Sequence, residues 1–361
     1  MASLRKKWQK FCNALDPLQG LDQTAWLSRA QQETPQAVAV VEPEWRGIYS
    51  STRNLFPVIL PVKDSLNRRS AERVAELLRA TGARRVVISG FPLSFVHLVE
   101  ALRHGPRPLE VFGLWHGSFV QSNENYNWRS FVTLKDLAER GLVSKLGFVK
   151  TGMAEALQRL GIRASFVMNA IDETPAGPST PLAGGPHFGL WAVRLATWRK
   201  LPYAMLVAAT AVPGSMLHVG GADERVIEFV REMRVRAQVS QGAVPQAELP
   251  GRLREMHLNL YVTFSECCPM VPMESLAVGA PCLLGPTSHL FEDDAYLHSR
   301  LVVPYPDRHE VIARYIRVAV EERSEIVAAY RRWLPDYVAA SRHSVAEFLD
   351  LASAGQRSHA A

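Results

Sequence analysis

Short apolar stretches alternate with amphipathic stretches along most of the chain. The apolar stretches predict strands, which in the first half cover 37–41, 56–62, 85–90, 109–115, 145–149 and 164–168. The amphipathic stretches between them predict helices, which cover 70–80, 95–103, 132–141 and 152–160. Strands that alternate with helices favour a parallel, doubly wound sheet with helices on both faces.

The second half repeats this alternation after a segment rich in proline and glycine. Residues 173–186 hold four prolines and three glycines, which predicts a linker. Beyond it we predict strands at 187–193, 216–221 and 258–264, and helices at 223–238, 310–322 and 325–351. We therefore expect an N-terminal α/β domain over 1–172, a C-terminal α/β domain over 187–330, and a final segment, 331–361, in which a helix packs across both domains and ends in a tail.

A pair of glutamates follows the last predicted strand of the second domain. Glu266 stands where strand 258–264 ends, and Glu274 comes eight residues later. Pro272 suits the first turn of a helix and Gly279 suits the left-handed residue past its end, so we expect Glu274 in the first turn of a two-turn helix. Both carboxylates should then face the crevice outside the carboxyl end of the strand, beside a helix N-terminus, where open α/β sheets bind ligands.

The spacing Glu-x7-Glu, followed by Ser-Leu-Ala-x-Gly-x-Pro over 275–281, resembles the signature of the family 4 retaining glycosyltransferases. These enzymes have the GT-B architecture, in which two Rossmann-like domains face a cleft. The resemblance implies that Glu266 contacts hydroxyls of the donor sugar and that Glu274 holds the ribose of the nucleotide. The family usually has glycine and an aromatic residue after the first glutamate, whereas Cys-Cys-Pro stands at 267–269. The alternative is one helix-capping glutamate beside one exposed glutamate.

The same resemblance implies a donor site built from further segments of the second domain. Family members carry an arginine and a lysine that clasp the donor diphosphate; Arg194 and Lys200 match them, with Arg199 as a second candidate for the lysine. These cations suit a diphosphate because arginine offers a planar fork and lysine a compact charge, although solvated loop cations are the alternative. Residues 244–250 resemble the loop that contacts the nucleobase. The other residues that we assign to the donor are Gly220, Cys268, Met270 and Val271.

In the first domain, two segments that follow strands carry the candidates for catalysis and acceptor binding. His116 comes directly after strand 109–115 and resembles the family's active-site histidine, which lies close to the donor sugar and the acceptor. Gly47 and Tyr49 follow strand 37–41, and the resemblance implies that they lie in a loop that faces the acceptor. A lone histidine or glycine after a strand is otherwise an ordinary structural residue.

The composition is that of a globular protein, with 47% hydrophobic and 21% charged residues among 361. The net charge of +6 fits an anionic ligand or an anionic membrane surface, and nucleic acid is not favoured because the basic residues are spread along the chain. The four cysteines lack the spacing of a disulfide framework or a zinc site, which indicates a reducing compartment. We expect no cofactor and no metal, since the nucleotide sugar is a substrate and the acidic run 292–294 suits helix capping.

The start of the chain is charged, and no run of eighteen apolar residues occurs anywhere in the sequence. We therefore expect a cytoplasmic protein. Residues 4–11 are basic with interleaved aromatic residues, a pattern that can lie on an anionic membrane as a peripheral contact. A solvated first helix that packs its aromatic residues inward is the preferred interpretation of this segment.

These features together predict an enzyme that transfers a hexose from a nucleotide diphosphate sugar to an acceptor, with retention at the anomeric carbon. The acceptor is left open: a glycan, a lipid carrier, a protein or another molecule. One alternative is a different enzyme on the same fold, such as a nucleotide-sugar epimerase or a glycogen-phosphorylase-like protein. The other is a non-catalytic GT-B partner subunit of another transferase, which the altered segment 267–269 keeps open.

Overall fold

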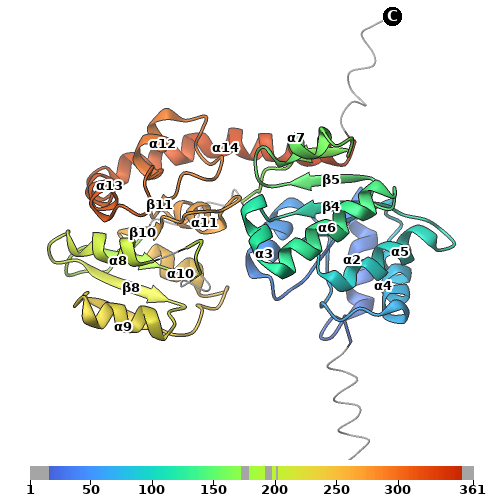
Figure 1. The fold of residues 1–361 in the computed structure, drawn as a ribbon, viewed down its shortest axis with the longest axis horizontal. Helices are drawn as coiled ribbons and strands as arrows, with labels where there is room; N and C mark the ends of the chain where they lie inside the picture. The colour runs from blue at the N-terminus through green and yellow to red at the C-terminus, as the bar shows by residue number, and fades with distance from the viewer. Residues whose placement is uncertain (1–15, 172–178, 192–196, 201, 352–361) are drawn as a thin grey trace, which may run out of the picture. The chain divides into compact units, whose positions relative to one another are not determined.

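The structure is a computed structural model that describes residues 16–171, 179–191, 197–200 and 202–351. The chain divides into two compact units (Figure 1), here called unit 1 and unit 2. Unit 1 contains residues 1–170 and 340–361, and unit 2 contains residues 171–339. The basic segment 4–11 and residues 172–178 of the expected linker lie outside the described residues.

Unit 1 is built on a sheet whose described strands all pair in parallel, in the order β2-β1-β3-β4-β5-β6. These strands are β1 (Ala37–Val41), β2 (Ile59–Pro61), β3 (Arg85–Ser89), β4 (Glu110–Trp115), β5 (Lys145–Phe148) and β6 (Ala164–Phe166). Every residue of β1 is buried, as expected for a strand covered on both faces. The strand order reverses between β1 and β3, which makes their carboxyl ends a place where α/β sheets bind ligands.

Helices lie on both sides of this sheet (Figure 1). They are α2 (Gln23–Glu33), α3 (Arg46–Leu55), α4 (Arg68–Ala80), α5 (Val96–His104), α6 (Asn125–Glu139) and α7 (Met153–Gln158), with 3-10 turns η1 (Leu93–Phe95) and η2 (Phe119–Asn123). Their apolar faces and the strands share one hydrophobic core. The alternation of strands and helices predicted for the first half of the chain is therefore present in unit 1.

Gly47 and Tyr49 lie in helix α3, which begins at Arg46, and our expectation of a loop there is wrong. Helix α3 follows β1 closely, and its Ser51 and Thr52, about one turn beyond Ile48, are buried. The predicted strand 56–62 is correspondingly short, because only Ile59–Pro61 pairs with β1. A short helix of this kind is stabilised mainly by packing of one face, which residue order alone does not reveal.

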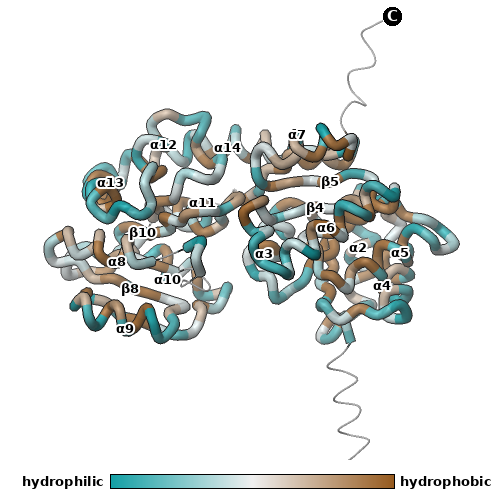
Figure 2. The backbone as a smooth tube through the Cα atoms, in the orientation of Figure 1, coloured by the Kyte–Doolittle hydropathy of each residue, from teal (hydrophilic) through white to brown (hydrophobic). Residues whose placement is uncertain are grey.

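Unit 2 also contains a sheet whose described strands all pair in parallel, in the order β11-β10-β7-β8-β9. Its strands are β7 (His187–Leu190), β8 (Met216–Gly220), β9 (Ala237–Ser240), β10 (Leu258–Tyr261) and β11 (Cys282–Leu284). Its helices are α8 (Tyr203–Thr210), α9 (Glu224–Glu232), α10 (Leu249–Arg254), α11 (Met270–Ala277), α12 (Ala295–Leu301), α13 (His309–Glu321) and most of α14 (Arg323–Phe348). Figure 2 shows strand β8 as an apolar segment, in contrast to the hydrophilic loops at the periphery. The strand order reverses between β7 and β10.

The helix predicted over 223–238 is in fact two elements. Helix α9 is capped by Asp223 and ends before Arg234, whose φ of 50° is left-handed. The chain then forms β9, which pairs with β8 at the edge of the sheet. Side chains of β9 alternate between partly buried and exposed, the pattern of an edge strand rather than a helix.

Helix α14 contributes to both units. Its residues up to 339 belong to unit 2, where Trp333 donates a hydrogen bond to Asp293 Oδ1 at 2.9 Å. Its last residues belong to unit 1, where the buried Phe348 meets Phe112 edge to face with ring centroids 5.4 Å apart. Of the helices that the structure describes, none has both the length and the apolarity to cross a membrane.

The Phe348 contact leads to a prediction on stability. Phe348→Ala removes a fully buried ring from unit 1, and we expect a loss of about 3–5 kcal/mol in its free energy of unfolding. Hydrogen exchange of the β4 amides, followed by mass spectrometry across a urea series, measures this loss. The control is Leu160→Ala, at a side chain that is 64% exposed, which should change stability by less than about 0.5 kcal/mol. Equal effects of the two substitutions would contradict the packing described.

Candidate functional site

The carboxyl end of β10 gathers a tyrosine, a glutamate and a lysine. Tyr261, the last residue of β10, is buried and donates a hydrogen bond from its hydroxyl to Glu266 Oε1 at 3.0 Å. Lys200 Nζ lies 5.5 Å from the centroid of the Tyr261 ring. Burial and the neighbouring Glu266 carboxylate both raise the pKa of Tyr261 well above its usual value, because both disfavour a phenolate. Tyr261 therefore stays protonated and acts as a hydrogen-bond donor to Glu266.

Two cations share this cluster. Burial lowers the pKa of Lys200, the Glu266 carboxylate opposes that shift, and the nearby Arg199 adds to it. The backbone is held in place as well: Phe264 N–H donates to the Arg199 carbonyl at 2.8 Å, and Glu266 N–H donates to Thr287 Oγ1 at 2.9 Å. The structure thus brings the predicted residues Arg199, Lys200 and Glu266 together, whereas Arg194 lies outside the described residues.

The second glutamate lies on α11, but not in its first turn as we expected. The helix begins at Met270, directly after Pro269, so Glu274 is its fifth residue and lies in the second turn. Gly279 has the expected left-handed φ of 80° just past the helix. Glu274 Oε1 accepts a hydrogen bond of 3.5 Å from Gln246 Nε2, which belongs to the segment expected to contact the nucleobase. The expectation of a carboxylate beside the free N–H groups of this helix is therefore wrong for Glu274.

The other predicted donor residues near α11 differ in their exposure. Cys268 is buried, with its Sγ 3.8 Å from the hydroxyl of Tyr337 in α14, and Met270 is buried as well. Val271 is partly exposed and, like Trp191, packs against a small cluster of Leu249, Leu253 and Val278. Val271 is thus the member of this group that remains at the surface of unit 2.

A buried hydrogen-bond network joins the end of β7 to β10 and α11. Trp191 Nε1 donates to Asn259 Oδ1 at 2.9 Å, and Asn259 Nδ2 donates to Ser275 Oγ at 2.8 Å. Ser275 in turn donates to the Ala280 carbonyl at 2.6 Å. Sequence reasoning missed this network, although a lone asparagine inside the apolar run 258–262 is a signal for it.

The glycine predicted to lie at the nucleotide, Gly220, lies under Trp191. A Cβ added to Gly220 would come 3.0 Å from the Trp191 ring, and one added to Gly189 would come 2.1 Å from Trp191 Nε1. Both glycines therefore make room for the indole. Trp191 and Val244 occupy the space beside Gly220 in unit 2.

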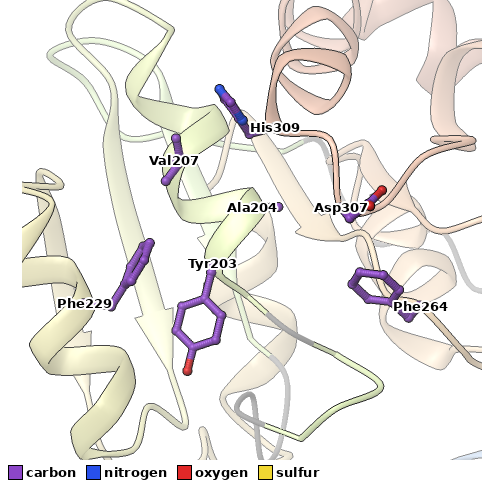
Figure 3. Close-up of a pocket in the computed structure, with 7 residues that line it drawn as sticks. All are labelled: Tyr203, Ala204, Val207, Phe229, Phe264, Asp307 and His309. Atoms are coloured by element: carbon purple, nitrogen blue, oxygen red, sulfur yellow. The ribbon is translucent and has the colours of Figure 1, made fainter.

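The described part of unit 2 also contains an apolar pocket of about 300 Å³ (Figure 3). Tyr203 and Val207 reach it from α8, Phe229 from α9, and Phe264 and Asp307 from loops. The rings of Tyr203 and Phe229 pack together with centroids 4.8 Å apart. No residue that the sequence predicted for the donor lines this pocket, and its apolar wall does not suit a diphosphate.

In unit 1, His116 lines a small cavity of about 60 Å³ at the carboxyl ends of the strands. Its Nε2 lies 2.9 Å from Ser89 Oγ, and Ser89 Oγ lies 2.6 Å from Thr52 Oγ1. Burial lowers the pKa of His116 to about 3, so the imidazole is neutral at physiological pH. A neutral imidazole can exchange hydrogen bonds with hydroxyl groups without carrying charge.

The predicted acceptor residues Gly47 and Tyr49 do not line this cavity, whereas their neighbours Trp45 and Ile48 do. A Cβ added to Gly47 would meet no atom within 4 Å, so this position does not need glycine for close packing. Gly90 does: its φ is 69° and an added Cβ would come 3.0 Å from the Trp45 ring. Trp45 and Ile48 are three residues apart, which is the spacing of apolar residues on one face of a helix. This spacing could have identified them in the sequence as residues that line the cavity.

The acidic run 292–294 has structural roles in unit 2. Asp294 caps α12 by accepting a hydrogen bond from Leu297 N–H at 2.9 Å, and Asp293 accepts one from Trp333. Within the described ranges, no group of three or more His, Cys, Asp or Glu side chains is placed to hold a metal ion.

The low pKa of His116 predicts a pH dependence of stability in unit 1. The unfolded histidine takes up a proton below about pH 6.5, whereas the folded one does so only near pH 3, so folding loses stability as pH falls below 6.5. At about 1.4 kcal/mol per pH unit, His116 should cost up to about 2 kcal/mol between pH 6.5 and 5. Urea unfolding of the wild type and of His116→Gln at both pH values measures this, with pH 7.5 as the reference. Parallel losses in the two proteins would contradict the burial of this ring.

Comparisons with known proteins identify the fold. Neither the known protein families nor the curated proteins contain a match to the sequence. Among solved structures, a HepE protein of Anabaena in complex with UDP-glucose matches with a TM-score of 0.65 and 12% identity, over 87% of this chain and 99% of its own. A glycosyltransferase of Rickettsia africae matches with a TM-score of 0.60 and 11% identity, over 87% and 98%.

The sucrose-phosphate synthase of Thermosynechococcus elongatus matches with a TM-score of 0.55 and 13% identity, over 87% of this chain and 95% of its own. Such low identities establish the fold and nothing finer. The order of elements, the two parallel sheets and these neighbours agree with one another. The chain has the GT-B fold, with two α/β domains of the Rossmann-like kind.

Proposed function

We propose that the protein is a glycosyltransferase that moves a hexose from a nucleotide diphosphate sugar to an acceptor, with retention of the anomeric configuration. The observation that carries this proposal is the cluster at the end of β10, where Glu266, Lys200 and Arg199 surround Tyr261. It combines a carboxylate for sugar hydroxyls with cations for a diphosphate at the edge of the sheet where α/β proteins bind ligands. The structural neighbour solved with UDP-glucose supports the class of donor.

In this proposal, the cations stabilise the leaving diphosphate. As the glycosidic bond breaks, negative charge develops on the diphosphate oxygens, and preorganised cations lower the free energy of that state. Lys200 suits the task because it is partly buried, where a charge interaction is screened less by water than at the open surface. Arg199 supplies a planar guanidinium beside it, and Arg194 is assigned to the same task on the sequence resemblance. Because the side chains supply the positive charge, we propose that transfer needs no metal ion.

The remaining predicted residues take positioning roles. Glu266, held by the Tyr261 hydroxyl, binds hydroxyls of the donor sugar, and Glu274 binds the ribose next to Gln246. We assign Val271, Met270, Cys268 and Gly220 to the walls of the donor site on the resemblance alone. His116 binds a hydroxyl of a sugar, and the acceptor lies against Trp45 and Ile48, next to the residues first predicted for it.

One observation favours a second candidate, a non-catalytic GT-B partner subunit. In the segment that follows Glu266, Cys268 is buried against Tyr337 of α14, whereas the resembling family has glycine and an aromatic residue after the first glutamate. A partner subunit would bind the nucleotide sugar without turnover. Transfer or hydrolysis of a labelled nucleotide sugar by the purified protein decides between the two candidates.

Donor binding is the first prediction of this proposal. In a thermal-shift panel of nucleoside diphosphates and nucleotide sugars, one base should raise the melting temperature, because a ligand at 100 times its Kd adds about 2.7 kcal/mol of stability. Glu274→Ala and Lys200→Met should each abolish most of the shift. The control Glu228→Ala removes an exposed carboxylate of α9 and should keep it. A flat response of the wild type across the panel would rule out the proposed donor site.

The Tyr261 hydroxyl gives a second prediction. Tyr261→Phe keeps the ring beneath Lys200 but leaves Glu266 without its donor, which should lower kcat/KM for the nucleotide sugar roughly 10- to 100-fold, the value of one hydrogen bond to a charged group. Initial rates of donor hydrolysis or transfer measure it. Tyr305→Phe, at a ring that is 54% exposed, is the matched control and should leave the rate unchanged. An unchanged rate in Tyr261→Phe would remove Tyr261 from the site.

A further inference from the structure

Three side chains far apart in the sequence form one chain of hydrogen bonds in unit 1. Thr52 Oγ1 donates to the carbonyl of Ile48 at 2.6 Å and lies 2.6 Å from Ser89 Oγ. Ser89 Oγ lies 2.9 Å from His116 Nε2. Thr52 and Ser89 have no exposed surface, so water does not compete for these bonds.

The direction of each bond follows from counting protons. A hydroxyl carries one hydrogen and can donate one bond. Thr52 uses its hydrogen on the Ile48 carbonyl, so Ser89 is the donor in the bond between the two hydroxyls. Ser89 has then used its own hydrogen and can only accept from the imidazole, which requires a hydrogen on His116 Nε2.

We infer that Thr52 and Ser89 hold His116 in its Nε2–H tautomer, and that the Nδ1 lone pair accepts a hydrogen bond from a hydroxyl of a neutral sugar. Within the described residues, no side chain or backbone group donates to Nδ1. The ring stays neutral because burial lowers its pKa to about 3, so one nitrogen is always left as an acceptor. Thr52 and Ser89 are positioning residues, since they act through His116.

The cavity around His116 supports a neutral ligand. Its other lining residues carry no charge: Trp45, Ile48, Gly90, Phe91, Trp115, Gly117, Gln121, Asn127 and Ser130. A volume of about 60 Å³ holds a group of a few heavy atoms, such as a hydroxymethyl group, rather than a whole sugar ring. A carboxylate in this cavity would face the lone pair of His116 Nδ1, and no cation among the described residues lines the cavity to balance its charge. The cavity should therefore discriminate against sugar acids.

The choice of a sugar as the ligand rests on the proposed function. The tautomer of His116 can be tested without an activity assay. Long-range ¹H–¹⁵N correlation spectra of the full-length protein, with His116→Gln to assign the signals, report which ring nitrogen carries the hydrogen. We expect Nε2–H in the wild type between pH 6 and 8. An Nδ1–H tautomer in the wild type would overturn the inference.

Two variants of Thr52 separate positioning from mere packing. Thr52→Val keeps the shape but removes the acceptor of the Ser89 hydrogen, so Ser89 can donate to His116 Nε2 and the Nδ1–H form should appear. Thr52→Ser retains the hydroxyl and should keep the wild-type tautomer. A tautomer that does not respond to Thr52→Val, in a protein shown to be folded by its amide spectrum, would overturn the role of the hydroxyl chain.

Ligand titrations followed at the His116 nitrogens test the specificity. Methyl glucoside or UDP-glucose should change the chemical shift of His116 Nδ1. A response to methyl glucoside assigns the hydroxyl to the acceptor, and a response to UDP-glucose alone assigns it to the donor. Glucuronate and UDP-glucuronate should bind roughly tenfold more weakly or worse, because they leave buried polar groups unsatisfied. Suppose that UDP-glucose raises the melting temperature, but that neither methyl glucoside nor UDP-glucose shifts the Nδ1 signal of His116. The inference is then wrong and the proposed function stands. If a neutral sugar shifts Nδ1 but no nucleotide sugar binds, the inference stands and the proposed function fails.

Discussion

All strand pairs described in both units are parallel, so the residues that follow the strands lie at one edge of each sheet. Parallel strands require crossovers, and in these units the crossovers carry helices that cover the faces of the sheet. Strand pairing and the packing of helices on the sheet therefore stabilise each unit, and side chains at the carboxyl ends of the strands are not needed for this. That edge is free to carry polar side chains such as Glu266 and His116, whose positions depend on the pairing beneath them.

Both units use the same packing device beside their polar clusters. A tryptophan from the segment after one strand lies against a glycine at the carboxyl end of a neighbouring strand: Trp45 against Gly90, which follows β3, and Trp191 against Gly220, the last residue of β8. The absence of a Cβ lets the indole approach the backbone closely. Each tryptophan therefore forms an apolar surface near a polar side chain, which is His116 in unit 1 and Asn259 in unit 2. The space beside each glycine is filled by the indole ring.

Several buried polar side chains at the sheets take part in more than one hydrogen bond. Asn259 bonds to a tryptophan, a backbone carbonyl and Ser275, and Thr52 with Ser89 reaches His116. A buried amide or hydroxyl with no partner costs about 1–3 kcal/mol, so such groups are stable only in one arrangement of their neighbours. The network at Asn259 holds α11 and the end of β7 in register, and the hydroxyl chain sets the orientation of the histidine.

The sequence alone determined the fold class and the residues that stand at strand ends, because alternation of short apolar runs with amphipathic helices is a local pattern that parallel sheets require. It also singled out Glu266 and His116 through their place after apolar runs, and Arg199 and Lys200 through the resemblance to a known family. The tertiary structure decided what each of them touches. The hydrogen bond from Tyr261 to Glu266 is a matter of side-chain rotamers, and the bonds that join Thr52, Ser89 and His116 cross 37 and 27 positions of the chain.

The ends of helices and strands were also decided by the tertiary structure rather than by the sequence alone. The segment from Arg46 became helix α3, α11 began at Met270 and so placed Glu274 in the second turn, and the end of a predicted helix became β9. Local propensity is a weak signal over a few residues, and burial against the rest of the unit or pairing at a sheet edge outweighs it. Such burial depends on which distant segments lie alongside, so it is a property of the folded unit and not of the local sequence.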